Sequence, residues 1–184
     1  MRLQVWVTMA VAALAVAGRA DAAVTVFGGG MAEDCSHAAI AGKSDPASIL
    51  TCSLALGGED LDRIDRAGTL INRGVMKLRR LAFEEARADL DAAIALTPSI
   101  GEAWINLGAV AVGERHYEAA LDDLNKALKL GVKEPEKAYF NRALAYEGLD
   151  DEKSAYFDYQ QALALKPGWS LPKTELLRFT VTRR

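Results

Sequence analysis

The polar residues with the most regular spacing in this chain are three asparagines. Asn72, Asn106 and Asn141 are separated by 34 and 35 residues. A side-chain amide offers both a hydrogen-bond donor and an acceptor, so a row of three amides could bind the backbone of an extended peptide. Apolar residues accompany each asparagine, one position before it and three positions after it: Ile71, Ile105 and Phe140, and Val75, Ala109 and Leu144. These residue types indicate recognition of another chain rather than bond making or breaking.

Few other residues could support catalysis or bind a metal. His37 and His116 are the only histidines in the sequence, and one histidine does not make a metal site. Gly42-Lys43-Ser44 resembles the end of a phosphate-binding loop, but His37 stands where that motif needs its first glycine. We therefore expect no enzyme activity, no catalytic residue, no cofactor and no metal.

The first 22 residues are predicted to be a secretory signal peptide. Arg2 supplies a positive charge, residues 3–17 are mostly apolar, and Ala20-Asp21-Ala22 matches a small-residue cleavage site. The apolar run is shorter than the roughly 20 residues of a membrane span, so we expect none after cleavage; an uncleaved anchor is the alternative. This pattern predicts a periplasmic or secreted protein. The net charge of −3 and the lack of a basic stripe argue against nucleic acid.

The spacing of the asparagines is shared by many other residues. Alanines and aspartates repeat with it, in the series Ala86, Ala120 and Ala155, then Ala93, Ala127 and Ala162, then Asp89, Asp123 and Asp158. Self-similarity at such a period indicates stacked supersecondary units, none of which can bury its apolar face alone. Pro98 and Pro167 close the first and third units.

At these positions the chain resembles the tetratricopeptide repeat family. The second and third units follow that family's pattern of W-x2-L-G-x2-Y, A-x3-F and P through Trp104, Leu107, Gly108 and Ala120, and through Tyr139, Ala143, Tyr146, Ala155, Tyr159 and Pro167. The resemblance implies an all-α fold: an α-solenoid of three helical hairpins, over residues 67–100, 101–135 and 136–169. We expect a flexible lead-in and a degenerate hairpin over residues 23–66, and a capping helix and tail over residues 170–184.

The repeat register also predicts helix bounds and contacts. We expect helices over 31–41, 46–57, 67–80, 83–96, 101–114, 117–130, 136–148 and 151–165, with a cap between 171 and 179. Arg73 and Arg142 occupy sites that are usually apolar, and we expect them to pair with Asp89 and Asp158 or else to reach solvent. Asp123 would then need another partner or water.

Continuing the frame towards the N-terminus places Cys35 and Cys52 at facing sites of the degenerate hairpin. In an exported chain this predicts one disulfide. A cross-link over about 17 residues would contribute about 3 kcal/mol in the chain-entropy model. Two buried free thiols are the alternative.

The family resemblance places the nine residues around the asparagines in a concave groove, because the first helix of each repeat lines that surface. Ile71, Asn72, Val75, Ile105, Asn106, Ala109, Phe140, Asn141 and Leu144 are the predicted partner-binding residues. Their apolar character suits a hydrophobic extended or helical peptide and does not suit a strongly acidic ligand. Alternatively, the asparagines bond to a neighbouring helix, or the N-terminal segment folds into the groove. We expect a non-enzymatic adaptor for a protein or peptide partner, with a self-associating structural oligomer of the bacterial envelope as the alternative.

Overall fold

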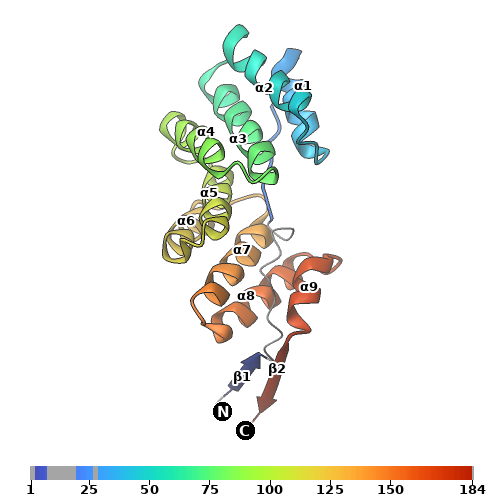
Figure 1. Cartoon of the computed structure of the whole chain (residues 1–184), viewed down its shortest axis with the longest axis vertical. Helices are drawn as coiled ribbons and strands as arrows, with labels where there is room; N and C mark the ends of the chain where they lie inside the picture. The colour runs from blue at the N-terminus through green and yellow to red at the C-terminus, as the bar shows by residue number, and fades with distance from the viewer. Residues whose placement is uncertain (1–2, 8–19, 27–28, 184) are drawn as a thin grey trace.

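The computed structural model describes residues 3–7, 20–26 and 29–183. Within these ranges the chain forms four helical hairpins, a ninth helix and a two-stranded sheet, stacked along one long axis (Figure 1). The helices are α1 (Gly30–Ile40), α2 (Pro46–Gly58), α3 (Arg63–Arg79), α4 (Phe83–Leu96), α5 (Gly101–Gly113), α6 (Tyr117–Leu130), α7 (Pro135–Gly148), α8 (Glu152–Leu165) and α9 (Ser170–Leu176). The all-α solenoid predicted from the repeat is confirmed.

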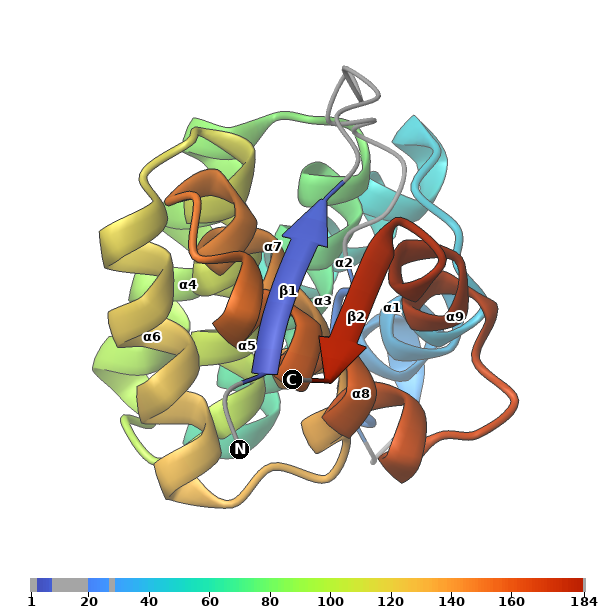
Figure 2. The same cartoon turned by 90° about the horizontal axis from the view of Figure 1, so that it is seen from below.

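The two short strands lie at the C-terminal end of the solenoid. β1 (Leu3–Val7) pairs antiparallel with β2 (Phe179–Arg183), so that Leu3 faces Arg183 and Val7 faces Phe179. Figure 2, seen along the solenoid from this end, shows the two strands side by side. The capping helix α9 ends at Leu176, three residues earlier than expected, because residues 179–183 are extended and paired with β1.

Local capping explains where several helices begin. The Asp62 carboxylate accepts hydrogen bonds from the backbone N–H groups of Ile64 and Asp65, at 2.7 and 2.8 Å. This cap starts α3 at Arg63, four residues before the expected position. Asp45 caps α2 in the same way, and Pro46 occupies its first turn, where a missing N–H costs nothing.

The repeat is visible in the backbone of the turn inside each of the three hairpins. Leu81, Arg115 and Asp150, again 34 and 35 residues apart, have φ angles of 64°, 63° and 58°. Residues other than glycine rarely adopt this left-handed conformation. Its recurrence shows that the packing of the two helices in each hairpin imposes one turn geometry, whatever side chain the turn carries.

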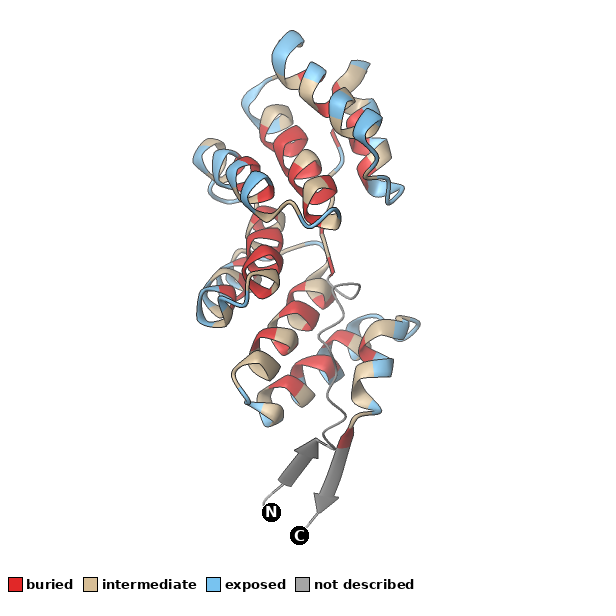
Figure 3. Cartoon of the chain, in the orientation of Figure 1, coloured by how far each residue is buried: buried red, intermediate tan, exposed pale blue. Residues whose placement is uncertain are grey.

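Close crossing of the paired helices depends on small residues. Ala86, Ala120 and Ala155 are fully buried at the crossings. Gly108 of α5 lies so close to α6 that an added Cβ would stand 2.5 Å from Cγ of Leu124. Figure 3 shows that buried residues concentrate on α3, α5 and α7, while the outer faces of α4 and α6 are exposed.

The predicted pairs between arginine and aspartate are confirmed. Arg73 donates to both carboxylate oxygens of Asp89, at 2.9 and 2.6 Å, and Arg142 donates to both oxygens of Asp158, at 2.6 and 2.9 Å. Hydrogen bonding to Asp158 raises the pKa of Arg142 further above its usual value. Each pair ties the two helices of one hairpin together across a partly buried surface.

Asp123 occupies the same register position in the middle repeat, where Leu107 replaces the arginine. Burial raises its pKa to about 6, although the positive charge of Arg87 acts in the opposite direction. The ionised carboxylate of Asp123 is therefore less well compensated than those of Asp89 and Asp158.

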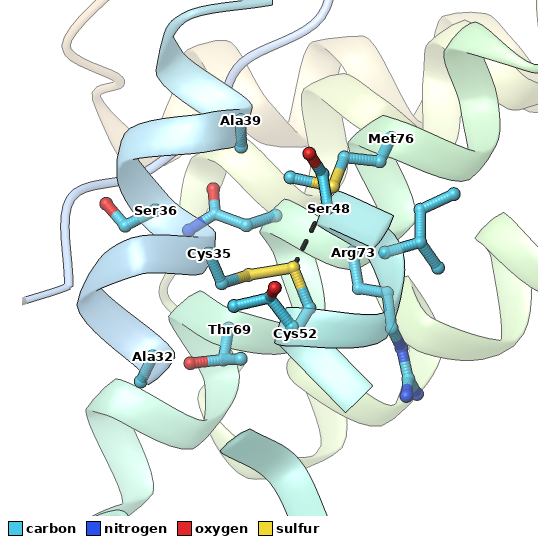
Figure 4. The surroundings of a disulfide bond; sticks show 12 residues. Ala32, Cys35, Ser36, Ala39, Ser48, Cys52, Thr69, Arg73 and Met76 are labelled. Carbon is cyan, nitrogen blue, oxygen red and sulfur yellow. Dashed lines mark hydrogen bonds between the residues drawn. A yellow bond between two sulfur atoms is a disulfide. The ribbon is translucent and has the colours of Figure 1, made fainter. Parts of the chain in front are cut away.

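The N-terminal hairpin is cross-linked and docked on the first repeat. A disulfide joins Cys35 of α1 to Cys52 of α2, with the sulfur atoms 2.10 Å apart. Both cysteines are fully buried, and the Cys52 sulfur lies 3.8 Å from the Met76 sulfur of α3 (Figure 4). The hairpin thus shares its small core with the helix that carries Asn72.

Replacing Gly108 with alanine should destabilise the fold, since the new methyl group cannot fit without displacing Leu124. We expect a loss of about 1–3 kcal/mol in the free energy of unfolding, measured by urea denaturation. Gly57→Ala is the matched control: its Cβ would meet no atom within 4 Å, and it should leave stability unchanged or raise it slightly. Equal losses in the two variants would contradict the close crossing of α5 and α6.

Asp123→Asn should stabilise the protein at pH 7.5 but not at pH 4.5. A raised pKa means that the folded state binds the proton more tightly, so the parent loses stability as the pH rises from about 4 through 6. Because asparagine cannot ionise, we expect the variant to gain stability on the order of 1 kcal/mol at pH 7.5. This figure already allows for solvent screening of the partly exposed carboxylate. Thermal melts across this pH range would measure the gain, and a gain of the same size at pH 4.5 and pH 7.5 would contradict a raised pKa of Asp123.

Candidate functional site

The three asparagines lie on the inner side of the solenoid, at the same position of α3, α5 and α7. Asn72, Asn106 and Asn141 are fully buried. Residues 20–26 cover them, running as an extended segment along these helices towards α1 (Figure 1). We call residues 20–26 the groove segment.

Each asparagine makes the same two hydrogen bonds to the groove segment. Its side-chain oxygen accepts from the backbone N–H of one residue, and its side-chain nitrogen donates to the carbonyl of that same residue. The donor–acceptor distances are 3.0 and 2.6 Å for Asn141 with Ala20, 2.8 and 2.9 Å for Asn106 with Ala22, and 2.9 and 2.8 Å for Asn72 with Val24. The expected row of amides is therefore present. It binds residues 20–26 of the chain itself, as in the alternative that the N-terminal segment folds into the groove.

The groove segment and the row of asparagines match because their spacings agree. Contacts fall on every second residue of the groove segment, because alternate residues of an extended chain face the same way. Two extended residues advance about 7 Å, so one pair of residues bridges from each repeat to the next. The order is antiparallel, since Ala20 meets the third repeat and Val24 meets the first.

A fourth contact extends this pattern onto the N-terminal hairpin. The backbone N–H of Val26 donates to Oγ of Ser36, and that hydroxyl donates to the carbonyl of Val24, both at 3.1 Å. Ser36 is not among the residues predicted from the sequence. Continuing the repeat frame assigns Asp34 to this position, and Asp34 is exposed.

The six apolar residues predicted beside the asparagines, which we call the apolar floor, lie beneath the groove segment. Of the nine predicted groove residues, Leu144 alone is only half-buried. Ala20 packs in the cluster of Phe140, Ala22 in that of Ile105, and Val24 against that of Ile71. Gly68 leaves room for the segment, since a Cβ there would lie 2.9 Å from a methyl group of Val26.

An ion pair holds the groove segment from its other side. Both oxygens of Asp21 accept from Arg79 at the end of α3, at 3.0 and 2.6 Å. Arg79 also donates to the carbonyls of Ala39 and Lys43, which fixes its guanidinium between α3 and the end of α1. The sequence showed no sign of this pair, because its partners are 58 residues apart and outside the repeat register.

The site is built to hold a backbone. Within the described ranges, no three His, Cys, Asp or Glu side chains gather in a way that would hold a metal ion. No helix in the same ranges has the length and apolar character needed to cross a membrane. Each asparagine contacts the backbone N–H and C=O of one residue, a pair of groups that every residue except proline carries, so the asparagines alone discriminate little between sequences.

Comparison with known proteins supports the assignment of the repeat. A family model described as tetratricopeptide repeat matches residues 101–130 and 136–168. These two stretches of the chain are therefore tetratricopeptide repeats. No curated protein matches it.

Several solved structures share the fold. The Arabidopsis OM64 tetratricopeptide domain is 24% identical, with a TM-score of 0.60, covering 64% of this chain and 96% of that one. MamA is 20% identical, with a TM-score of 0.60, covering 77% and 80%. The second tetratricopeptide domain of human RPAP3, solved in complex with an HSP70 peptide, is 24% identical, with a TM-score of 0.57, covering 63% and 96%.

Removing one amide should cost stability only while the groove segment is present. In the full chain, Asn106→Ala leaves the buried N–H and carbonyl of Ala22 without partners, so we expect a loss of at least about 2 kcal/mol by urea denaturation. In a chain that begins at Ala23 the loss should fall below half of that value. Equal losses in both chains would contradict the pairing, and the exposed Gln161→Ala is the control.

Proposed function

We propose that this protein is a non-enzymatic adaptor of the bacterial envelope that binds an extended segment of a partner protein in its concave groove. The observation that carries this proposal is the set of paired hydrogen bonds between the three asparagines and alternate backbone units of the groove segment. A site that binds the backbone of one extended segment can bind the backbone of another. Rigid repeats also lose little conformational freedom on binding, which favours affinity.

The site of action follows from the predicted signal peptide. Cleavage after Ala22 would place the mature protein in the periplasm or outside the cell. A single disulfide between Cys35 and Cys52 suits such an oxidising compartment. The bound peptide in the RPAP3 structure gives a precedent for peptide binding by this fold, although fold likeness alone does not name a ligand.

The alternative is a self-associating structural oligomer. The mature chain would keep residues 23–26, so these residues from a second copy would make the same hydrogen bonds to Asn72 and Ser36. Exchange of an identical element between copies is a low-cost route to dimers. Light scattering on the mature protein distinguishes the two functions, because a dimer that persists at every concentration would favour self-association.

In-cell cross-linking tests the adaptor function. A photoreactive residue at Leu144, which is half-buried at the groove, should capture a partner of defined mass, whereas one at the exposed Lys126 of α6 should not. Adding Asn106→Ala should abolish the Leu144 adduct if the partner binds through the amides. An adduct that persists in this variant would overturn the proposal, and an adduct of twice the chain mass would indicate self-association instead.

A further inference from the structure

The groove segment contains the predicted cleavage site. Ala20 and Ala22, the small residues that such a site requires, are 5% and 0% exposed because their backbones pair with Asn141 and Asn106. Cleavage must therefore occur before this segment settles in the groove. Once it has occurred, Ala20, Asp21 and Ala22 no longer belong to the mature chain.

Cleavage divides the groove into two parts. The part that stays filled holds Val24 on Asn72 and Val26 on Ser36. The part that is emptied, which we call the vacated section, consists of Asn141, Asn106 and Arg79 with the apolar floor around Phe140 and Ile105. Emptying this section exposes its apolar residues and leaves Arg79 with only the carbonyls of Ala39 and Lys43 as acceptors. A ligand that buries these apolar residues again must also restore the hydrogen bonds of the two amides, so the section favours an extended backbone with an acidic group.

The side chains that now fill this section show what such a ligand must carry. Ala20 and Ala22 present only a methyl group to the clusters of Phe140 and Ile105, and both are buried there, so a larger side chain would meet packed atoms. Between them, the Asp21 carboxylate receives two hydrogen bonds from Arg79. A bidentate arginine–carboxylate contact is specific for an acidic group.

The end of the vacated section adds a further requirement. Ala23 to Val26 still occupy the next stretch of the groove, so a bound segment cannot continue along it beyond the position of Ala22. The new N-terminus at Ala23 carries a positive charge at neutral pH, next to that position. A ligand that ends there with a free carboxylate would face this ammonium group.

Building on the proposed function, we propose that the vacated section binds the C-terminal tail of a partner protein with the sequence small–acidic–small. The tail lies antiparallel to the order of the repeats, with its first small residue on Asn141, its acidic side chain on Arg79 and its last small residue on Asn106. Removal of the leader thus leaves open, for a tail of similar sequence, a section of the groove that the unprocessed chain fills itself.

Fluorescence anisotropy with a synthetic peptide tests this proposal. The processed chain, purified from cells and starting at Ala23, should bind a labelled peptide of residues 16–22 with a free C-terminus. Three altered peptides should bind at least tenfold more weakly: one with Asp21→Lys, one with Ala22→Phe and one with an amidated C-terminus. These comparisons need no variant of the protein. Equal binding of all four peptides, or no binding of any, would overturn the proposal.

A charge exchange provides the matched test on the protein. Arg79→Glu should bind the original peptide at least tenfold more weakly and should gain affinity for the Asp21→Lys peptide, while Arg80→Glu, at the exposed neighbouring residue, should behave as the parent. Indistinguishable behaviour of the two variants would also overturn the proposal. If all four peptides bind equally well but the cross-link at Leu144 in cells still depends on Asn106, the adaptor function is supported and only this ligand sequence is rejected.

Discussion

The structure depends on one interaction, the pair of hydrogen bonds that links a buried asparagine amide to both polar groups of a single backbone unit. A buried carboxamide must find partners for its donors and its acceptor. An extended chain offers a donor and an acceptor on one side at every second residue. The three asparagines find their partners in this way: Asn72 pairs with Val24, Asn106 with Ala22 and Asn141 with Ala20. The filled groove is therefore part of the protein core.

The rest of the solenoid keeps the three amides in step with the extended segment. Small residues at the helix crossings and one turn conformation at Leu81, Arg115 and Asp150 hold each hairpin in the same shape. The pairs of Arg73 with Asp89 and Arg142 with Asp158 tie the outer helix of a hairpin to its inner helix. Because each repeat has nearly the same geometry, the amides recur at the interval that two extended residues can span.

Periodic features were predictable from the sequence, and features outside the period were not. The bounds of α4 and α6 agree with the expected ranges, since apolar residues and alanines recur in step there. Asn72 was predicted as a backbone ligand from its register. Ser36 lies two residues from the position that the frame assigns, and the Arg79–Asp21 pair and the β1–β2 pairing join distant segments without any repeat. No local pattern in the sequence encodes such contacts. The row of amides was therefore predictable, whereas the segment that it binds was only one of several possibilities.

Amide hydrogen exchange of the full chain tests the central claim most directly. If the asparagines hold alternate backbone units, the N–H groups of Ala20, Ala22 and Val24 should exchange slowly, and those of Asp21, Ala23 and Thr25 should exchange much faster. The slow exchange at Ala22 should disappear in Asn106→Ala. Uniformly fast exchange from residue 20 to residue 26 would show that the segment does not occupy the groove and would contradict the account.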